Sequence, residues 1–231
     1  MRAFAVLSSN CAGRQGLLAE NGLSLYIRFD DTDIIFDTGA GPLFSDNAEF
    51  MNLPLHKAEL AVISHAHPDH CGGIPVLSGI FSMVSMCCKI YHPEGIELAG
   101  LPALRSIPVM EETEISDNIR LILTSSETET GPLQELSLIA GNTLFTGCGH
   151  AGLMKIVKTA KEYSMIDTIA GGFHNFNMSV NEMKQNAQAT VEAGIKRMVL
   201  LHCSSMRSVR YFEDEGIDVR IGLVGNSFEF I

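Results

Sequence analysis

Apolar stretches of strand length alternate with turn residues through the first half of the chain. Each stretch is either continuously apolar or alternates between apolar and polar positions, which is typical of β-strands. They predict strands at residues 3–7, 23–29, 33–37, 60–64, 119–124 and within 135–146. Asp30-Asp31 and Gly141-Asn142 stand between neighbouring stretches, and each pair predicts the turn of a hairpin.

Helical periodicity enters in the second half of the chain. Apolar side chains recur at helical spacing over residues 152–163, with lysines between them. Ser179 and Glu182 have the spacing of a capping box, which predicts a helix from there to Gly194. The remaining pattern predicts short strands at 166–170 and 197–201, a helix at 208–215 and further strands within 217–230.

This order of elements indicates the fold class. Runs of strands followed by interleaved helices are typical of an α/β protein whose helices cover its sheets. Because hairpin turns join the stretches within 119–146, we expect mixed sheets rather than purely parallel ones. No repeat, low-complexity run or linker-like segment divides the sequence, so we predict a single domain over residues 1–231.

Composition narrows the classes of function. Hydrophobic residues make up 46% and charged residues 19% of the chain, which suits a soluble globular protein. The 16 basic and 27 acidic residues give a formal charge of −11, which repels a phosphate backbone, so no nucleic-acid partner is expected. Without a secretion signal, the six cysteines are expected to be free thiols of a cytoplasmic protein. A homo-oligomer is compatible with this composition.

One uncharged stretch reaches the lower length limit of a membrane span. It covers residues 71–88 and contains two adjacent glycines, a further glycine, a proline and several serines. These residues make a poor hydrocarbon helix. We therefore expect no membrane insertion and interpret the stretch as buried protein interior.

The strongest chemical signal follows the strand predicted to end at residue 64. Three histidines and a carboxylate fall within six positions there. In an extended segment residues two apart point the same way, so His65 and His67 can bind one metal ion together. Pro68 then turns the chain, after which Asp69 and His70 can reach a second ion. Asp69 is also the candidate catalytic residue that handles the proton of a metal-bound water. The alternative, a solvated histidine-rich loop, is disfavoured by this spacing.

Further histidines follow other predicted strands. His150 comes after a strand and a glycine-rich turn, and His202 comes directly after an apolar strand. A single histidine in such a position is more often structural, but the motif at 65–70 needs more ligands, so we predict both as metal ligands. His174 follows Gly171-Gly172 in the same way, and we predict that it acts in catalysis or binds substrate. The two other histidines, His56 and His92, are interpreted as ordinary loop residues.

The HxHxDH pattern, preceded by Phe36-Asp37-Thr38-Gly39, resembles the metallo-β-lactamase superfamily. Further blocks resemble a branch named after a dihydropterin-ribofuranosyl-aminobenzene phosphate synthase of methanopterin biosynthesis. These blocks are Ala19–Ser24, Phe36–Gly39, Thr146–Gly152, Gly171–His174 and His202-Cys203. The resemblance implies a four-layer αββα sandwich of two mixed sheets with helices outside, and a dinuclear site at one edge between the sheets. It also implies that Asp37 supports the metal-binding loop, although an Asp before Thr-Gly can equally be a turn former.

The sequence departs from the superfamily pattern at one position. The superfamily usually has a bridging aspartate after a strand that resembles Leu144–Gly147, and here Cys148 stands in that place. The usual upstream histidine is also missing, since no histidine lies between His92 and His150. Either His150 supplies the imidazole from a different place, or one metal position lacks a ligand. Cys148 can bridge as a thiolate, which favours zinc or iron, or can be a small buried thiol.

These observations lead to a hypothesis about function. We expect a metal-dependent hydrolase or hydrolase-like enzyme with a dinuclear centre that activates water against a small ester- or phosphate-bearing substrate, which the branch suggests to be pterin-related. The expected cofactor is two divalent ions per chain, zinc first, with iron or manganese as alternatives. Alternatives for the function are a lactonase or phosphodiesterase at the same site, an iron-dependent redox protein, or a non-catalytic metal-dependent binding protein.

Overall fold

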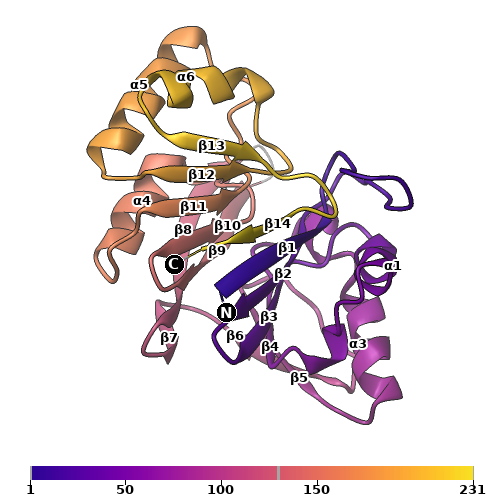
Figure 1. Cartoon of the computed structure of the whole chain (residues 1–231). Coiled ribbons are helices and arrows are strands. Elements are labelled where there is room, and N and C mark those ends of the chain that lie inside the picture. The colour runs from indigo at the N-terminus through magenta and orange to yellow at the C-terminus, as the bar shows by residue number, and fades with distance from the viewer. Residues whose placement is uncertain (1, 129–130, 231) are drawn as a thin grey trace. The chain divides into compact units, whose positions relative to one another are not determined.

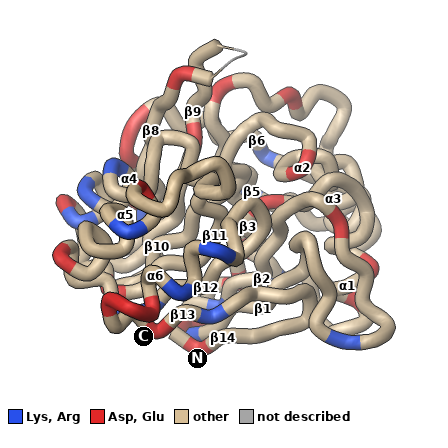
Figure 2. The backbone as a smooth tube through the Cα atoms, turned by 90° about the horizontal axis from the view of Figure 1, so that it is seen from above, with Lys and Arg blue, Asp and Glu red and all other residues tan. Residues whose placement is uncertain are grey.

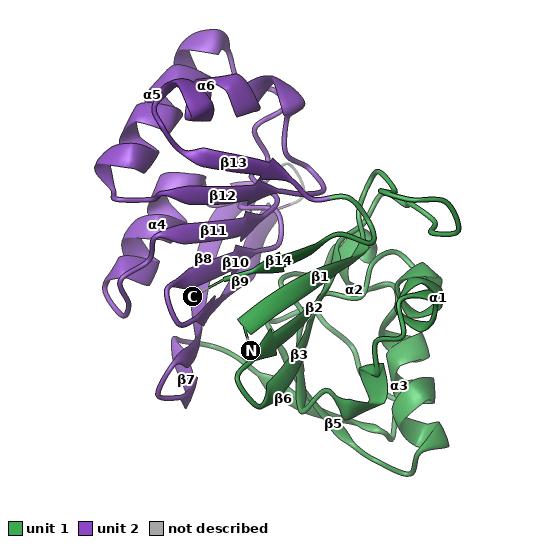
Figure 3. Ribbon diagram, in the orientation of Figure 1, with its two compact units in different colours: residues 1–110, 223–230 green, residues 111–222, 231 purple. Residues whose placement is uncertain are grey.

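The computed structural model describes residues 2–128 and 131–230. The chain forms two compact units, which are distinguished by colour in Figure 3. Unit 1 comprises the residues up to Met110 together with Leu223–Phe230, and unit 2 comprises Glu111–Gly222. Each unit is built on one β-sheet and its own helices, and most strands and helices are labelled in Figure 1. The single domain expected over the whole chain stays a prediction.

The described part of unit 1 contains one sheet with the strand order β14-β1-β2-β3-β4-β5-β6. Its strands are β1 Arg2–Ser8, β2 Ser24–Phe29, β3 Thr32–Phe36, β4 Leu60–Val62, β5 Cys88–His92, β6 Leu104–Pro108 and β14 Ser227–Glu229. Pairing is antiparallel from β14 through β3 and parallel from β3 through β6. The sheet is therefore mixed, as the sequence predicts.

The helices of unit 1 pack on one face of this sheet. They are α1 Leu43–Phe50, the 3-10 turn η1 Leu55–Lys57, the short α2 Pro68–Cys71 and α3 Ile74–Met83. Phe44 of α1 and Phe81 of α3 share a buried core with Ile35 and Ile90 of the sheet. Burial of such large side chains stabilises the layer, since each contributes about 1.5–3 kcal/mol.

The interpretation of residues 71–88 as buried throughout is wrong. Leu77 and Phe81 of α3 are buried, but residues 82–87 are exposed, and Met83 is 80% exposed. The physical reason is that the sheet covers only one side of α3, and that residues 84–87 form the connection after the end of the helix. No helix among residues 2–128 and 131–230 is long and apolar enough to cross a membrane.

Unit 2 has a second mixed sheet, with the strand order β13-β12-β11-β10-β9-β8-β7 over its described residues. Its strands are β7 Thr113–Ser116, β8 Ile119–Thr128, β9 Gly131–Ala140, β10 Thr143–Thr146, β11 Thr168–Gly171, β12 Arg197–Leu200 and β13 Asp218–Ile221. Pairing is antiparallel from β7 through β10 and parallel from β10 through β13. The carboxyl ends of β10, β11 and β12 therefore meet at one edge.

The helices of unit 2 pack on the sheet through a buried apolar core. They are α4 Leu153–Lys161, α5 Val180–Glu192, the 3-10 turn η2 Met206–Ser208 and α6 Val209–Asp214. Ile156, Met183 and Phe212 bring α4, α5 and α6 into this core. The capping box predicted for α5 is confirmed: Ser179 Oγ accepts from the backbone N–H of Glu182, whose carboxylate accepts from the backbone N–H of Ser179.

Three lysines lie on α4, where Figure 2 shows Lys and Arg positions in blue. Two of the α4 lysines hold neighbouring segments. Lys155 Nζ donates to the carbonyl of Ser125 at 2.8 Å, and Lys161 Nζ donates to the carbonyl of Ala193 at 2.6 Å. The second contact places a cation at the carboxyl end of α5, where the helix dipole favours positive charge.

Candidate functional site

The site in unit 1 begins where two parallel strands end side by side. Phe36 at the end of β3 pairs with Val62 at the end of β4, so the residues that follow both strands lie at the same edge of the sheet. Asp37 comes directly after β3, and its backbone N–H donates to the carbonyl of Val62 at 2.8 Å. Its φ is +59°, in the left-handed region that non-glycine residues adopt at a cost. The backbone here is held in a conformation that the neighbouring strands impose.

The carboxylate of Asp37 is fully buried and holds the histidine motif. It accepts hydrogen bonds from Ser64 N at 2.6 Å, from Ser64 Oγ at 2.7 Å and from His70 Nδ1 at 2.6 Å. A histidine whose Nδ1 carries the shared proton presents the lone pair of Nε2 to a metal. Asp37 therefore makes the contact that the predicted supporting role requires.

The imidazoles of the motif converge. His65 Nε2 and His67 Nδ1 lie 3.0 Å apart, and the ring centroids of His65 and His70 lie 4.1 Å apart. His65 Nδ1 is also 2.9 Å from Ser64 Oγ, which orients the ring. Two nitrogens that bind one zinc ion at 2.0–2.1 Å each are about 3.3 Å apart in a tetrahedral site. The spacing of His65 and His67 therefore fits one shared cation.

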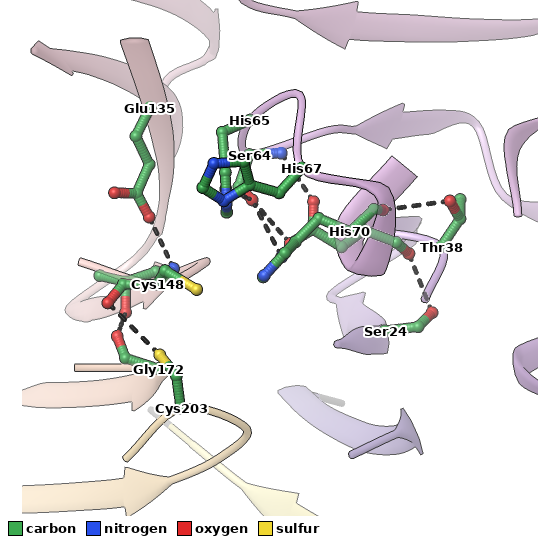
Figure 4. Close-up of polar contacts among 12 residues, drawn as sticks. Ser24, Thr38, Ser64, His65, His67, His70, Glu135, Cys148, Gly172 and Cys203 are labelled. Atoms are coloured by element: carbon green, nitrogen blue, oxygen red, sulfur yellow. Dashed lines mark hydrogen bonds and ion pairs between the residues drawn. The ribbon is translucent and has the colours of Figure 1, made fainter. Parts of the chain in front are cut away.

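Backbone hydrogen bonds hold α2, which carries Asp69 and His70, against the loops that precede it. The carbonyl of Asp69 accepts from Leu23 N at 3.1 Å, and the carbonyl of His70 accepts from Thr38 N at 2.8 Å. Thr38 Oγ1 donates to the same His70 carbonyl at 3.1 Å, as drawn in Figure 4. Asp69 lies in the first turn of α2 with its side chain half-buried. The position of Asp69 is thus set by the backbone hydrogen bonds of Asp69 itself and of the next residue, His70.

The two glycines after the motif let the backbone pass closely. A Cβ on Gly72 would lie 2.3 Å from the carbonyl oxygen of Ala40, and a Cβ on Gly73 would lie 2.3 Å from that of Thr38. Neither contact leaves room for a side chain, because both obstacles are backbone atoms. Glycine at these two positions therefore allows the close backbone approach that α2 and its preceding loops require.

The parallel strands of unit 2 bring a second group of side chains to one edge of its sheet. Thr146, Gly171 and Leu200 are in register at the ends of β10, β11 and β12. The donor atoms of Cys148, His174 and Cys203, which follow these strands, all lie within 4.8 Å of one another. Cys203 Sγ also donates to the backbone carbonyl of Cys148 at 3.6 Å, as Figure 4 shows.

The other two predicted ligands lie in the same loops of unit 2. The ring of His150 is 4.7 Å from the ring of His174, measured between centroids. His202 is 8% exposed and directly precedes Cys203. His174 and His202 both have left-handed backbones, with φ of +44° and +47°. The predicted residues Cys148, His150, His174 and His202 therefore all follow parallel strands of one sheet.

The thiol and the imidazole at this edge perturb each other. A hydrogen bond with Cys148 lowers the pKa of the Cys203 thiol to about 4, against the effect of burial, and the contact with His174 acts in the same direction. The hydrogen bond with Cys203 raises the pKa of the His174 imidazole, while burial opposes the change. Both shifts favour a thiolate beside an imidazolium.

Sequence analysis misses a buried carboxylate under the same loop. Glu135 of β9 is 1% exposed. Its carboxylate oxygens accept from the backbone N–H groups of Cys148 at 2.7 Å, Gly149 at 2.8 Å and His150 at 2.7 Å. A charged residue within a stretch otherwise predicted as a buried strand is the signal that could have identified it, since buried carboxylates need partners.

Replacing Glu135 with glutamine is expected to lower the free energy of unfolding by about 2–3 kcal/mol, because the amide group must face one of the three backbone donors. Urea denaturation measures the change. The matched control is Glu114→Gln on β7, an exposed carboxylate that pairs with Arg120. The control is expected to change stability by at most about 0.5 kcal/mol. Equal effects of the two substitutions would contradict a structural role for Glu135.

The interpretation of His92 as a loop residue is wrong. It ends β5, is buried, and lies 2.8 Å from both the carbonyl of Pro93 and Ser106 Oγ through its two ring nitrogens. Strand pairing with β6 brings Ser106 close to His92, which local sequence does not reveal. His56 lies in η1, half-buried.

Comparison with protein families connects this chain to known proteins. A model of the Metallo-beta-lactamase superfamily matches residues 18–157. The chain is similar to 7,8-dihydropterin-6-methyl-4-(beta-D-ribofuranosyl)-aminobenzene-5'-phosphate synthase of Methanocaldococcus jannaschii, with 23% identity over 85% of each chain. It is also similar to an uncharacterized protein of that organism, with 25% identity over 78% of this chain and 82% of that protein.

Solved structures with the same fold cover the whole chain. A metal-dependent hydrolase of the β-lactamase superfamily superposes with a TM-score of 0.84 at 22% identity, covering 100% of this chain and 99% of the other. The short form of human tRNase Z gives a TM-score of 0.66 at 17% identity, covering 99% of each chain. At these identities the likeness shows the fold. The predicted fold class, α/β of the metallo-β-lactamase type with two mixed sheets, is confirmed.

Proposed function

Because the chain belongs to the metallo-β-lactamase superfamily, we propose that it is a metal-dependent hydrolase that acts on a small ester- or phosphate-bearing molecule. The observation that carries the proposal is the arrangement of the histidine motif. Two imidazole nitrogens, from His65 and His67, lie at the spacing of a shared cation. A buried carboxylate, Asp37, sets the tautomer of the third histidine, His70. Histidines whose ring orientation is fixed by a buried carboxylate are typical of metal sites.

The residues present fit divalent metal ions. We propose that His65, His67, Asp69 and His70 bind metal in unit 1, and that Cys148, His150 and His202 are further ligands, for a total of two ions per chain. Imidazole and carboxylate donors suit zinc, iron or manganese, and the thiol shifts the preference toward zinc or iron. When bound, such ions lower the pKa of a coordinated water and polarise the bond to be cleaved.

Three further side chains have proposed roles besides metal binding. Asp37 orients His70 and, through Ser64, also His65, so the imidazoles need no reorganisation when the substrate arrives. Asp69 is half-buried and held by its backbone, and we assign to its carboxylate the proton released by the attacking water. His174 is exposed and lies beside Cys203, and we assign to it a role in catalysis or in binding the substrate.

The similarity to a synthase named for a dihydropterin-containing 5'-phosphate supports a phosphate-bearing substrate, with a pterin-related compound as the specific candidate. Fold and metal site alone do not set the substrate. Lactones and phosphodiesters are the alternatives at the same site, because each also presents an oxygen-bearing centre for attack by an activated water.

Removing the metal with a chelator is expected to abolish hydrolysis, and restoring zinc, manganese or iron(II) is expected to recover it. The assay uses a panel of phosphomonoesters, phosphodiesters, carboxyl esters and lactones, with metal content measured by elemental analysis. Turnover of one class, dependent on added metal, supports the proposal. Bound metal without turnover of any class would instead indicate a binding protein, and iron with redox activity would indicate the redox alternative.

A further inference from the structure

Two cysteines and a histidine form a group of soft donors in unit 2. We propose that Cys148, His174 and Cys203 together bind one thiophilic divalent metal ion, zinc in the first place. Neither His174 nor Cys203 is among the metal ligands proposed above, and all three donors belong to unit 2. The inference rests on the proposed function in one respect, which is that Cys148 is a metal ligand in both.

The strand register of unit 2 explains why these three side chains meet. β10, β11 and β12 are parallel neighbours whose last residues pair directly. Cys148 follows β10 by two positions, and His174 and Cys203 follow β11 and β12 by three positions each. Residues that leave adjacent parallel strands at the same level necessarily lie close together. The group is thus a product of the sheet rather than of one flexible loop.

The distances fit a tetrahedral ion. All three donor atoms lie within 4.8 Å of one another. Sulfurs bound to zinc at 2.3 Å are about 3.8 Å apart in a tetrahedral site. Closing the difference needs a shift of at most about 1 Å, which side-chain rotation provides. Three protein donors leave one coordination position for a further ligand, which is the pattern of catalytic rather than structural zinc.

The surrounding backbone leaves space for the sulfurs and holds them in place. A Cβ on Gly172 would lie 2.6 Å from Cys203 Sγ and 2.5 Å from the carbonyl of Gly147, so only glycine allows the sulfur to sit there. The carboxylate of Glu135 fixes the backbone N–H of Cys148. Such outer contacts are what hold ligands at a metal site.

The segment after Cys203 is held in the same way. Asn175 is buried, and its Oδ1 accepts from the backbone N–H of Ser205 at 2.6 Å. Ser204 Oγ donates to the carbonyl of Gly171 at 3.2 Å. The segment after Cys203 is therefore tied both to the end of β11, before His174, and to Asn175, directly after it, which keeps both donors in position.

A disulfide between the two cysteines is the competing use of this geometry. No disulfide joins the two cysteines in the structure. A disulfide would not require the imidazole of His174, whereas a metal site uses it as a third donor. A metal site and a disulfide therefore differ in two ways. Only the metal site needs His174, and only in the metal site does an added metal ion bind the two thiols.

Cobalt(II) is the probe for the test, since thiolate ligation gives it a strong near-ultraviolet charge-transfer band. The full-length reduced protein is expected to show this band on titration with cobalt(II). In Cys203→Ser the band is expected to fall about twofold, because one of two metal–sulfur bonds is lost, with affinity at least about tenfold weaker. His174→Ala is expected to weaken cobalt binding while keeping the band at saturation. Cys87→Ser, an exposed thiol of unit 1, is the control and is expected to change nothing.

A second measurement needs no variant. Alkylation followed by mass spectrometry is expected to show that zinc protects Cys203 in the wild-type protein but leaves the exposed Cys11 equally reactive. An unchanged band in Cys203→Ser, unprotected Cys203, or a Cys148–Cys203 disulfide in the metal-saturated protein would each overturn the proposal. His67→Ala separates the two proposals, because it is expected to remove hydrolysis while the thiolate band stays.

Discussion

Replacing His67 with alanine is expected to lower the rate of metal-dependent hydrolysis by at least about a hundredfold, since losing even an outer partner of a ligand costs roughly 10–100-fold. His67 Nδ1 forms one half of a nitrogen pair 3.0 Å apart, so the variant leaves His65 Nε2 without its counterpart for a shared ion. Metal content is expected to fall at the same time. Elemental analysis of the purified variant, together with kcat/KM on the best substrate of the panel, measures both effects.

The fold should tolerate this change. His67 is only half-buried and lies just before the first turn of α2, so its removal opens no cavity in the core. His56→Ala is the matched control, because His56 is a half-buried histidine of the same unit that lies outside the motif. The control is expected to keep its metal and its rate. If His67→Ala also kept both, His67 would not be a ligand.

Replacing Asp37 with asparagine is expected to lower the free energy of unfolding by about 2–4 kcal/mol and the metal affinity by about 10–100-fold. The carboxylate is fully buried and accepts from two atoms of Ser64 and from His70. An amide has one accepting oxygen, and its NH₂ group must face a donor. The tautomer of His70 also loses its anionic partner. Urea denaturation measures the first effect and competition with a chelator of known affinity measures the second.

The chain offers a close control for this substitution. Asp30 also has a left-handed backbone, with φ of +54°, but it is exposed and pairs with Arg2. Asparagine tolerates left-handed φ, so neither substitution strains the backbone. Asp30→Asn is expected to change stability by at most about 0.5 kcal/mol. A similar small change in Asp37→Asn would show that the buried carboxylate does not hold the motif.

Local patterns predicted the elements that local forces determine. The hairpin turn at Asp30-Asp31 joins β2 to β3, and the capping box at Ser179 opens α5, both as the sequence indicates. The histidine motif was predictable for the same reason. His65 and His67 are two residues apart, and in an extended backbone such residues point the same way. These features need no knowledge of distant partners.

Features that depend on distant partners could not be predicted. Glu135 gains its role only when β9 places it beneath the loop after β10. Cys203 gains its role only when β12 pairs with β11, and β11 in turn with β10. Elements with weak patterns were missed as well. β6 and β7 are short and largely exposed, so neither shows the apolar run or regular alternation that identifies a strand.

The left-handed backbones at His174 and His202 place these positions under two opposing kinds of selection. Each costs about 1 kcal/mol relative to glycine, which adopts the same conformation freely. Glycine, however, supplies no imidazole. Selection for heat resistance therefore favours glycine where selection for activity favours His. A lineage that loses the reaction but keeps the fold would be free to drift toward glycine at these two places, and their composition in relatives becomes a record of whether activity was retained.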